Sequence, residues 1–328
     1  LCPFRGERFG GFQYTYQGNA IMARQIDWSD ITEVISHAQH FPPYELMQNK
    51  RIAFSHYIDF PLPSMFDDYQ ISRTIGSRTA RIALAREREQ YMAAKHVLCM
   101  SPWAARQVIE RCEIPEHKVH VVVPGANLPE AAFDKKVLFN NEDDELPDGK
   151  RIPLRIAFVG KVPLRKGLDR LVEAVRILRS RRLRVVVRVI GPEKNLFPDD
   201  PEIEHLGFIN KQQDSGRFVD ELRSCHIGAL PSYHEAFGIA ALEYLRCGIP
   251  ALITRTGGLG DSIPPECGII LEQNCTGDDI ADVLQELISN KDEYSRIRLN
   301  AIAKAEYASW ARCVEDFEKV WSGENTRK

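Results

Sequence analysis

The sequence contains no apolar run that approaches the roughly 18 residues needed to cross a bilayer. Its first ten residues, LCPFRGERFG, are polar and show neither an initiator Met nor a signal-peptide pattern, so we expect a fragment or a processed form. None of the eight cysteines forms a Cys-x-x-Cys pair, and several lie in apolar surroundings. We interpret them as reduced thiols of a cytoplasmic protein.

Neither sign of charge dominates, with 43 Lys and Arg against 46 Asp and Glu and a net charge of −3. This balance argues against wholesale nucleic-acid binding. One basic stripe, within 77–95, leaves two interpretations open: a solvated helix face, or contact with anionic lipid or an anionic acceptor. The stripe consists of Arg78, Arg81, Arg88 and Lys95.

A chain of 328 residues exceeds one average hydrophobic core and predicts two domains. In the C-terminal half, runs rich in β-branched residues alternate with apolar stripes of helical period, which is typical of a doubly wound parallel sheet. Strands are expected at 152–162, 183–192, 203–209, 225–232, 249–258 and 268–273. Helices are expected at 167–181, 214–224, 237–247 and 277–290, followed by a helical segment at 291–321.

The N-terminal half shows a weaker α/β pattern. Strands are expected at 31–38, 50–59, 96–101 and 118–125, and helices at 77–95 and 102–113. A polar, acidic and turn-rich stretch separates the halves and is the natural linker. We predict two Rossmann-like domains with a cleft between them. The expected division is an N-terminal domain over 1–138, a linker over 139–152, a C-terminal domain over 153–305, and a helix over 306–328 that packs back on the first domain.

Two glutamates, Glu235 and Glu243, bracket an apolar segment after the expected strand 225–232. Ligands of open α/β sheets bind outside the carboxyl ends of the strands, where a helix beginning near Phe237 leaves its first amides unpaired. Gly238 lets a ligand approach the backbone. At a rise of ~1.5 Å per residue, the two glutamates lie roughly 12 Å apart or less. This suits a long ligand rich in hydroxyls, although an exposed helix residue and a capping carboxylate remain alternatives.

A group of cations follows the expected strand 152–162. Gly160 closes that strand, and Lys161, Arg165 and Lys166 come next, ahead of a helix. Such cations form an anion site, because charge-assisted hydrogen bonds to phosphate are short and strong. Solvated loop charges are the alternative for Lys161 and Arg165. Hydroxyl acceptors on one side and phosphate donors on the other describe a nucleotide-sugar site.

The stretches FVGKVPLRKGLDRLVEA (158–174) and PSYHEAFGIAALEYLRCGIPAL (231–252) resemble the retaining glycosyltransferases of family 4, which have the GT-B fold. The signature of that family is a pair of glutamates with seven residues between them, in a Glu-x-Phe-Gly context. The segments 93–127 and RTGGLGDSI (255–263) also resemble parts of the family. The resemblance runs from about residue 93 to residue 321.

The resemblance implies an α/β GT-B fold, with two Rossmann-like doubly wound domains facing a central cleft and a short N-terminal domain. It implies that Glu235 contacts hydroxyls of the donor sugar, that Glu243 accepts from the ribose hydroxyls, and that Lys166 binds the diphosphate. The family usually has Arg where this chain has Lys161, which keeps the charge and loses the bidentate fork. Arg165 would compensate for that loss.

Further donor-binding positions follow from the same resemblance. Gly160 and Ala236 belong to the two donor loops, and the amides of Phe237, Gly238 and Ile239 would face the sugar or the diphosphate. The backbone of three residues after the expected strand 203–209 would line the base pocket; these are Gly207, Phe208 and Ile209.

The N-terminal domain departs from the family pattern, because few residues precede the segment IAFSHYID (52–59). RFGGFQY (8–14) is the candidate Gly-Gly loop, with Gly10 and Gly11 approaching the diphosphate, although an ordinary turn is also open. His56 matches the family's histidine near the reacting sugar. A hydrogen-bonded structural histidine is the alternative.

The resemblance implies a retaining hexosyltransferase that moves a sugar from a UDP- or GDP-sugar to an acceptor hydroxyl, in glycan, polysaccharide or glycoconjugate biosynthesis. Its catalytic group would comprise Glu235, His56, Lys166 and Lys161. We expect no metal and no other cofactor, because the cations take the place of a divalent ion on the diphosphate. A carbohydrate, lipid-linked or small-molecule acceptor is expected, in the cytoplasm, with peripheral membrane contact left open. The alternatives are a GT-B nucleotide-sugar epimerase and a non-catalytic nucleotide-sugar-binding protein.

Overall fold

The computed structural model describes residues 18–37, 52–68, 76–133 and 147–323. It divides into unit 1, Leu1–Val123 with Glu315–Lys328, and unit 2, Pro124–Val314. The first division lies earlier in the chain than residue 138, because the segment after Pro124 pairs with unit 2. Within that unit, the amide of Ala126 donates to the carbonyl of Ala308 at 2.8 Å. The helix α11 (Trp310–Ser322) contributes its first residues to unit 2 and the rest to unit 1.

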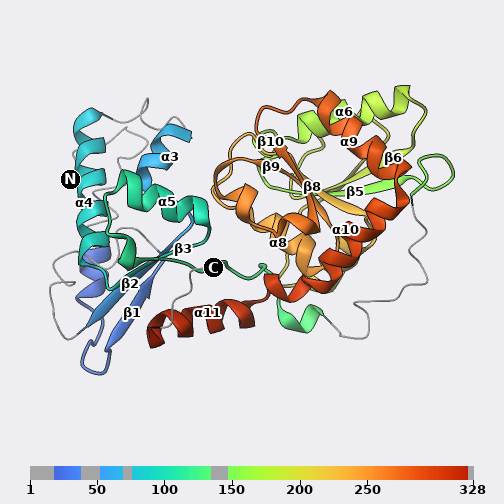
Figure 1. The fold of residues 1–328 in the computed structure, drawn as a ribbon. Helices are drawn as coiled ribbons and strands as arrows, with labels where there is room; N and C mark the ends of the chain where they lie inside the picture. Colours follow the sequence, from blue (N-terminus) through green and yellow to red (C-terminus); the bar gives the residue numbers. More distant parts are fainter. Residues whose placement is uncertain (1–17, 38–51, 69–75, 134–146, 324–328) are drawn as a thin grey trace. The chain divides into compact units, whose positions relative to one another are not determined.

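Unit 2 contains a six-stranded parallel sheet in the order β10-β9-β8-β5-β6-β7 (Figure 1). Along the chain, β6 and β7 are added to one side of β5, and β8, β9 and β10 are then added to its other side. The switch point between β5 and β8 is where such sheets bind ligands. All six strands were predicted from the sequence: β5 (Leu154–Val159), β6 (Val185–Ile190), β7 (Ile203–Gly207), β8 (Ile227–Leu230), β9 (Ala251–Arg255) and β10 (Gly268–Glu272).

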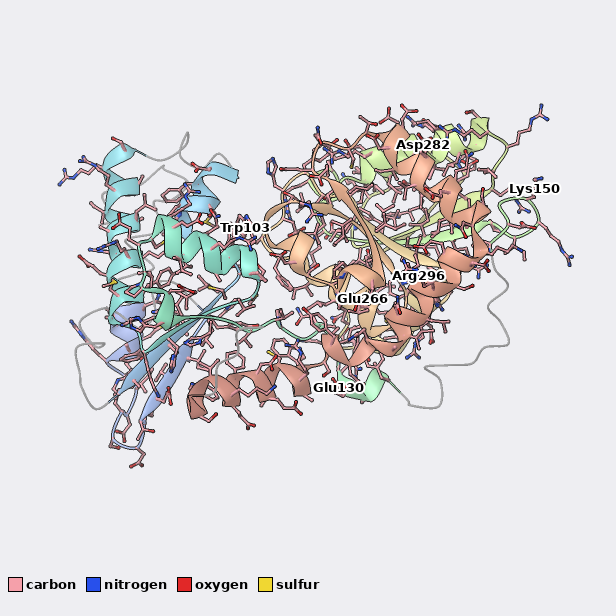
Figure 2. The ribbon with its side chains drawn as sticks, in the orientation of Figure 1. Trp103, Glu130, Lys150, Glu266, Asp282 and Arg296 are labelled. Carbon is pink, nitrogen blue, oxygen red and sulfur yellow. The ribbon has the colours of Figure 1, made fainter. Side chains whose placement is uncertain are left out.

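The helices of unit 2 also follow the prediction. Because the apolar stripes of α6 (Leu168–Ser180) and α9 (Gly277–Ser289) face the sheet, the fully buried side chains of Leu171 and Leu284 join that of Phe158 in one core cluster. Charged residues such as Asp282 of α9 and Arg296 of α10 point away from the sheet (Figure 2). The helical elements are η3 (Glu130–Ala132), α6 (Leu168–Ser180), α7 (Ser215–Arg223), α8 (Ile239–Arg246), η4 (Gly257–Asp261), η5 (Pro265–Cys267), α9 (Gly277–Ser289), α10 (Lys291–Ala303) and η6 (Ala305–Ala308).

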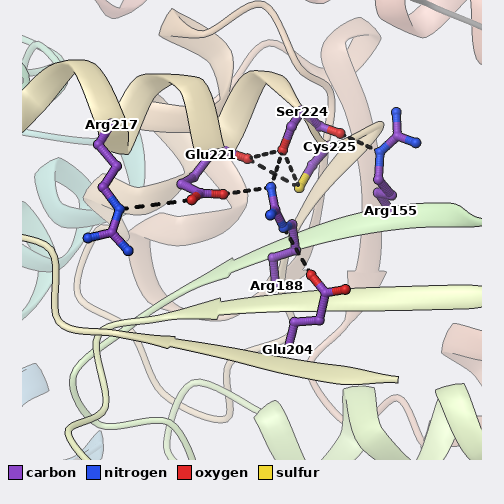
Figure 3. A network of polar contacts seen from close by, with 7 residues as sticks. All are labelled: Arg155, Arg188, Glu204, Arg217, Glu221, Ser224 and Cys225. Atoms are coloured by element: carbon purple, nitrogen blue, oxygen red, sulfur yellow. Dashed lines mark hydrogen bonds and ion pairs between the residues drawn. The ribbon is translucent and has the colours of Figure 1, made fainter. Parts of the chain in front are cut away.

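A network of charged groups holds α7 against the sheet (Figure 3). Arg188, in β6, lies 2.6 Å from the carboxylate of Glu221 in α7 and 3.1 Å from that of Glu204 in β7. The same guanidinium donates to the hydroxyl of Ser224 at 2.6 Å. One partly buried arginine therefore connects two strands with the helix that covers them.

Unit 1 contains a four-stranded parallel sheet in the order β1-β2-β3-β4. Its core gathers Ile58, Tyr91 and Val97, all fully buried. In α11, the ring of Phe317 packs edge-on against Tyr57 of β2, with centroids 4.9 Å apart. Besides a helical stretch at 18–23, the elements of this unit are β1 (Glu33–Ser36), β2 (Ala53–Ile58), α3 (Leu62–Asp68), α4 (Ser77–Ala93), β3 (His96–Cys99), α5 (Pro102–Arg111), η2 (Glu116–Lys118) and β4 (Val119–Val121).

The predicted strands and helices of unit 1 are confirmed, and α3 is an addition to them. With 7 residues, α3 is too short to show a helical apolar period, so the sequence pattern did not predict it. In the predicted basic stripe, Arg88 pairs with Glu113 at 2.9 Å and Lys95 with Glu33 at 3.2 Å. These two cations therefore belong to surface ion pairs within the unit.

Two further observations concern the cysteines and the helices of the described residues. The seven cysteines in the described ranges are buried free thiols. Among the same residues, no helix is both long enough and apolar enough to cross a membrane.

Candidate functional site

The two sequence groups singled out above meet at the switch point of the unit 2 sheet. Lys166 lies in the loop after β5, and Glu235 lies in the loop after the neighbouring strand β8. The Nζ of Lys166 donates to Oε2 of Glu235 at 2.7 Å, and the guanidinium of Arg165 lies 3.5 Å from Oε1. Two of the three predicted phosphate cations, Arg165 and Lys166, therefore form one cluster with the first predicted carboxylate at the carboxyl edge of the sheet.

The ion pair is largely enclosed, with side-chain exposures of 15% for Lys166 and 10% for Glu235. Gly160, directly after β5, makes room for it: a Cβ at that position would lie 2.3 Å from Cδ of Lys166. Arg165 fixes the opposite loop, because its guanidinium donates to the carbonyl of His234 and its own carbonyl accepts from the amide of Tyr233 at 3.0 Å.

The helix α8 begins at Ile239, close to the predicted start. Gly238 precedes it with a φ of 84°, and a Cβ there would lie 2.4 Å from the side chain of Leu259. A glycine is therefore required for the backbone to turn into α8 at this point. The amides at the start of the helix, those of Gly238, Ile239 and Ala240, are donors that a helix leaves unpaired. Phe237 itself is buried in the core, and Ala236 accepts from the amide of Gly258 at 2.9 Å.

Glu243 lies one turn into α8, and only 1% of its surface is exposed. Burial raises its pKa, while the positive charges of Lys211 and Lys166 act in the opposite direction. The Nζ of Lys211 donates to Oε1 of Glu243, and Oε2 has no hydrogen-bond partner among the described residues. A buried carboxylate oxygen without a donor is a group that a ligand hydroxyl can satisfy.

Lys211 was not predicted. It follows β7 by a few residues, at the same carboxyl edge as Lys161 and Lys166. That position was the available signal: a cation just beyond the carboxyl end of a predicted strand. Its partner lies 32 residues further along the chain, so only the fold brings the two together.

A hollow of about 430 Å³ opens beside β6 and β7, and Lys161, which follows β5 in the same loop as Lys166, lies on its wall. Phe208 is 54% exposed and lies on its wall, with the Nζ of Lys161 4.7 Å from the ring centroid. Gly207 ends β7 with a φ of 70°, and Ile209 is buried. An exposed aromatic ring beside a cation suits a flat ligand group. The lining residues are Lys161, Pro163, Gly191, Pro192, Glu193, Lys194, Leu196 and Phe208.

Tyr233, also missed in the sequence, holds the loop that carries Glu235. Its hydroxyl donates to Oδ2 of Asp169 at 2.8 Å, and the guanidinium of Arg170 lies 3.5 Å from its ring centroid. Its carbonyl accepts from Gln273 at 2.7 Å and from Thr256 at 3.2 Å. Burial and the bond to Asp169 raise the pKa of the Tyr233 hydroxyl. The loop is therefore fixed before any ligand binds.

The predicted residues of the N-terminal domain belong to unit 1. Gly10 and Gly11 lie outside the described residues. His56 lies in β2 and is fully buried, with its ring edge-on to Tyr91 of α4 at a centroid distance of 5.5 Å. This surrounding is that of a core side chain, and the catalytic role of His56 stays a prediction. Within the described ranges, no group of three or more His, Cys, Asp or Glu is placed to hold a metal ion.

Comparison with known proteins shows similarity to glycosyltransferases. The family described as "Glycosyl transferases group 1" matches residues 142–304. A D-inositol 3-phosphate glycosyltransferase from Nocardia farcinica is 30% identical over 345 residues, covering 98% of this chain and 70% of that protein. A relative of the same name from Nocardiopsis dassonvillei is 28% identical over 235 residues, or 66% of this chain and 53% of its own length. The match thus spans about half of that second relative.

Solved structures show the same fold. Sucrose-phosphate synthase from Thermosynechococcus elongatus has a TM-score of 0.70 at 15% identity, covering 96% of this chain and 79% of that one. Anabaena HepE in complex with UDP and glucose has a TM-score of 0.65 at 15% identity, covering 96% of this chain and 83% of that one. Two α/β units with parallel sheets, as found here, are the GT-B arrangement of secondary structure. The chain therefore belongs to the group 1 glycosyl transferases.

Proposed function

We propose that this chain moves a sugar from a nucleotide-diphosphate sugar to an acceptor hydroxyl, with retention of the anomeric configuration. The observation that carries the proposal is the enclosed ion pair between Lys166 and Glu235 at the switch point of the unit 2 sheet. The pair lies beside Glu243, because Glu235 belongs to the loop that leads into α8 and Glu243 lies one turn into that helix; the charge of Lys166 also acts to lower the pKa of Glu243. Cations and hydroxyl acceptors are thus present in one site, as a sugar nucleotide requires.

Each part of the donor has a matching group. The base would lie against Phe208 in the hollow beside β7, and the ribose hydroxyls would donate to the unpartnered oxygen of Glu243. The diphosphate would lie between Lys166, Arg165 and the first amides of α8, where the helix dipole favours an anion. Glu235 would then accept from hydroxyls of the donor sugar.

The same groups stabilise the transition state. As the glycosidic bond breaks, negative charge grows on the departing diphosphate and positive charge grows on the anomeric carbon. Lys166 and Arg165 offset the first charge without reorganisation, because both are already held against Glu235. Lys161 would add a further cation from the hollow beside Phe208. The proposal requires no metal, since these cations and amides neutralise the leaving group. The acceptor oxygen attacks the anomeric carbon from the face of the departing group and gives its proton to the departing phosphate oxygen, which yields retention without a protein nucleophile.

Two comparisons support the choice of donor and acceptors to test. HepE is described in complex with UDP and with UDP-glucose, so UDP-sugars come first among the donors. The Nocardia farcinica relative is named for D-inositol 3-phosphate, which adds phosphorylated polyols to the acceptors. A carbohydrate or lipid-linked acceptor stays within the proposal.

The test has two stages. First, UDP, GDP, ADP and dTDP sugars are screened for an increase in thermal stability, because a ligand that binds only the folded chain raises its melting temperature. Second, donors that bind are incubated with sugars, phosphorylated polyols and lipid-linked acceptors, and the anomeric configuration of the product is read by NMR. Binding followed by transfer with retention is expected. Release of an epimerised free nucleotide sugar, or failure to bind any nucleotide sugar, would contradict the proposal.

A further inference from the structure

Both oxygens of the buried Glu243 carboxylate can accept hydrogen bonds, but only one of them has a donor among the described residues. Glu243 is 1% exposed, and desolvation of this kind disfavours the charged form of a carboxyl group. Lys211 supplies the one donor, to Oε1. Because Oε2 is unpartnered among the described residues, half of the group is left for a ligand.

Lys211 itself is held in place. Its side chain is 29% exposed, and its Nζ lies 4.4 Å from the ring centroid of Phe218, a fully buried residue of α7. The aromatic face attracts the ammonium group on one side while the carboxylate binds it on the other. Such a lysine has a fixed position before ligand arrives, unlike a mobile surface lysine.

The other groups around Glu243 cannot replace this charge. Lys166 acts on it only through its charge and donates its own hydrogen bond to Glu235. The Tyr244 hydroxyl, on the same helix, and the Cys247 thiol, directly after it, stay neutral because burial raises the pKa of both. Lys211 is thus the only cation with a direct bond to Glu243 among the described residues.

We propose that Lys211 is a positioning residue of the donor site: it keeps Glu243 ionised and oriented, so that Oε2 accepts a ribose hydroxyl. The inference rests on the proposed function, because it takes the ligand to be a nucleoside diphosphate. A hydrogen bond to an ionised acceptor is roughly twice as strong as one to a neutral acceptor. Donor affinity therefore depends on Lys211 even if the lysine never contacts the nucleotide.

Removal of Lys211 has a signature that a general loss of structure lacks. Without the nearby charge, the pKa of Glu243 rises further, and the carboxyl group becomes protonated at a higher pH. Since the ionised form binds the hydroxyl better, nucleotide affinity in the variant falls as the pH is lowered, over a range where the wild-type protein is unaffected. In the variant the affinity recovers as the pH rises through the raised pKa.

The experiment measures the dissociation constants of UDP and GDP by calorimetry between pH 6 and pH 9. Lys211→Met is compared with Lys211→Arg, which retains the charge, and with Lys150→Met. Lys150 lies in a loop at the amino edge of the sheet, and its side chain extends away from unit 2 (Figure 2). We expect Lys211→Met to weaken binding by roughly tenfold or more at neutral pH, the scale of one charge-assisted bond. Lys211→Arg should recover most of that loss, and Lys150→Met should show none.

Two further measurements make the test specific. With 2′,3′-dideoxyuridine diphosphate, which lacks the ribose hydroxyls, Lys211→Met should change the affinity little. In the double variant Lys211→Met/Glu243→Gln the group cannot titrate, so the pH dependence seen with Lys211→Met alone should disappear. An equal loss of affinity at every pH, or an equal loss for the dideoxy nucleotide, would show that Lys211 has a merely structural role. If the wild-type protein binds neither UDP nor GDP, the proposed function fails first and the inference fails with it.

Discussion

The amide of Leu62 donates to both carboxylate oxygens of Glu87, at 3.0 Å each, and so ties the start of α3 to the middle of α4. Glu87 is fully buried, and it also accepts from the hydroxyl of Tyr91 at 2.9 Å. Desolvation raises the pKa of Glu87 to about 8, against the effect of these hydrogen bonds. The folded protein therefore holds a neutral carboxylic acid at this place near neutral pH.

The raised pKa of Glu87 predicts a pH-dependent stability of unit 1. In the unfolded chain the group ionises near its ordinary value, and in the folded chain it ionises only near pH 8. The contribution of Glu87 to the free energy of unfolding should therefore be greatest in acid and fall as the pH rises towards 8, by up to ~1.4 kcal/mol per pH unit. Urea unfolding of the wild type and of Glu87→Gln, at pH 6 and pH 8.5, measures it. A variant with the same pH slope as the wild type would refute the assignment.

The ion pair between Lys166 and Glu235 predicts strong, coupled losses of activity. Lys166→Ala removes a cation from the diphosphate site, and Glu235→Ala removes the acceptor for the sugar hydroxyls. Each change should lower kcat/KM for transfer by roughly 10²-fold or more, as when a preorganised group is lost. Because the two side chains touch, the double variant should lose less than the product of the single losses. Near-wild-type turnover in either single variant would contradict these roles.

Gly238 predicts a backbone effect at the start of α8. Alanine there must adopt a φ of 84° and meet the side chain of Leu259, so Gly238→Ala should lower the free energy of unfolding by ~1–3 kcal/mol. It should also weaken nucleotide-sugar binding, because the first amides of the helix shift. Gly216→Ala is the matched control, since nothing lies within 4 Å of a Cβ at that position in α7. Equal effects of the two substitutions would exclude the conformational explanation.

The ion pairs of Arg188 should stabilise the folded unit 2 independently of the donor site. Arg188→Met leaves the half-buried Glu221 carboxylate with Arg217 at 4.0 Å as its remaining cation. Loss of partly buried charged hydrogen bonds costs roughly 1–3 kcal/mol, so the urea midpoint should fall clearly. Arg296→Met is the control, because its pair with Glu293 is exposed on both sides and should contribute nothing measurable. If the two variants unfold alike, the network in Figure 3 does not hold α7.

The fold of unit 2 could be predicted because its strands are buried on both faces and read as continuous apolar runs. The strand β6, for example, is VVVRVI in sequence, and only Arg188 interrupts it. The Lys166–Glu235 cluster followed in turn, since both residues come directly after strands that the doubly wound order makes neighbours.

Other parts of the site have no local sequence signal. The bond between Lys211 and Glu243 joins residues 32 apart, and the bond between Tyr233 and Asp169 joins residues 64 apart. Neither follows from periodicity or spacing, because tertiary packing alone decides which loops face each other. His56, which the sequence matched to the family's histidine, lies in the core of its unit with its ring against Tyr91, and its catalytic role stays a prediction.

Tyr233 predicts that the loop after β8 can be loosened without touching the ligand. Tyr233→Phe keeps the ring under the Arg170 guanidinium and removes the hydroxyl, with its hydrogen bond to Asp169. The expected cost in stability is about 1 kcal/mol, typical of one hydrogen bond. Because this loop carries Glu235, the variant should lower kcat for transfer several-fold while the dissociation constant of the free nucleoside diphosphate stays the same. Stopped-flow transfer assays and calorimetry on one protein sample separate the two. A weaker nucleotide affinity with an unchanged kcat would instead place Tyr233 among the groups that bind the nucleotide, and the positioning role would be wrong.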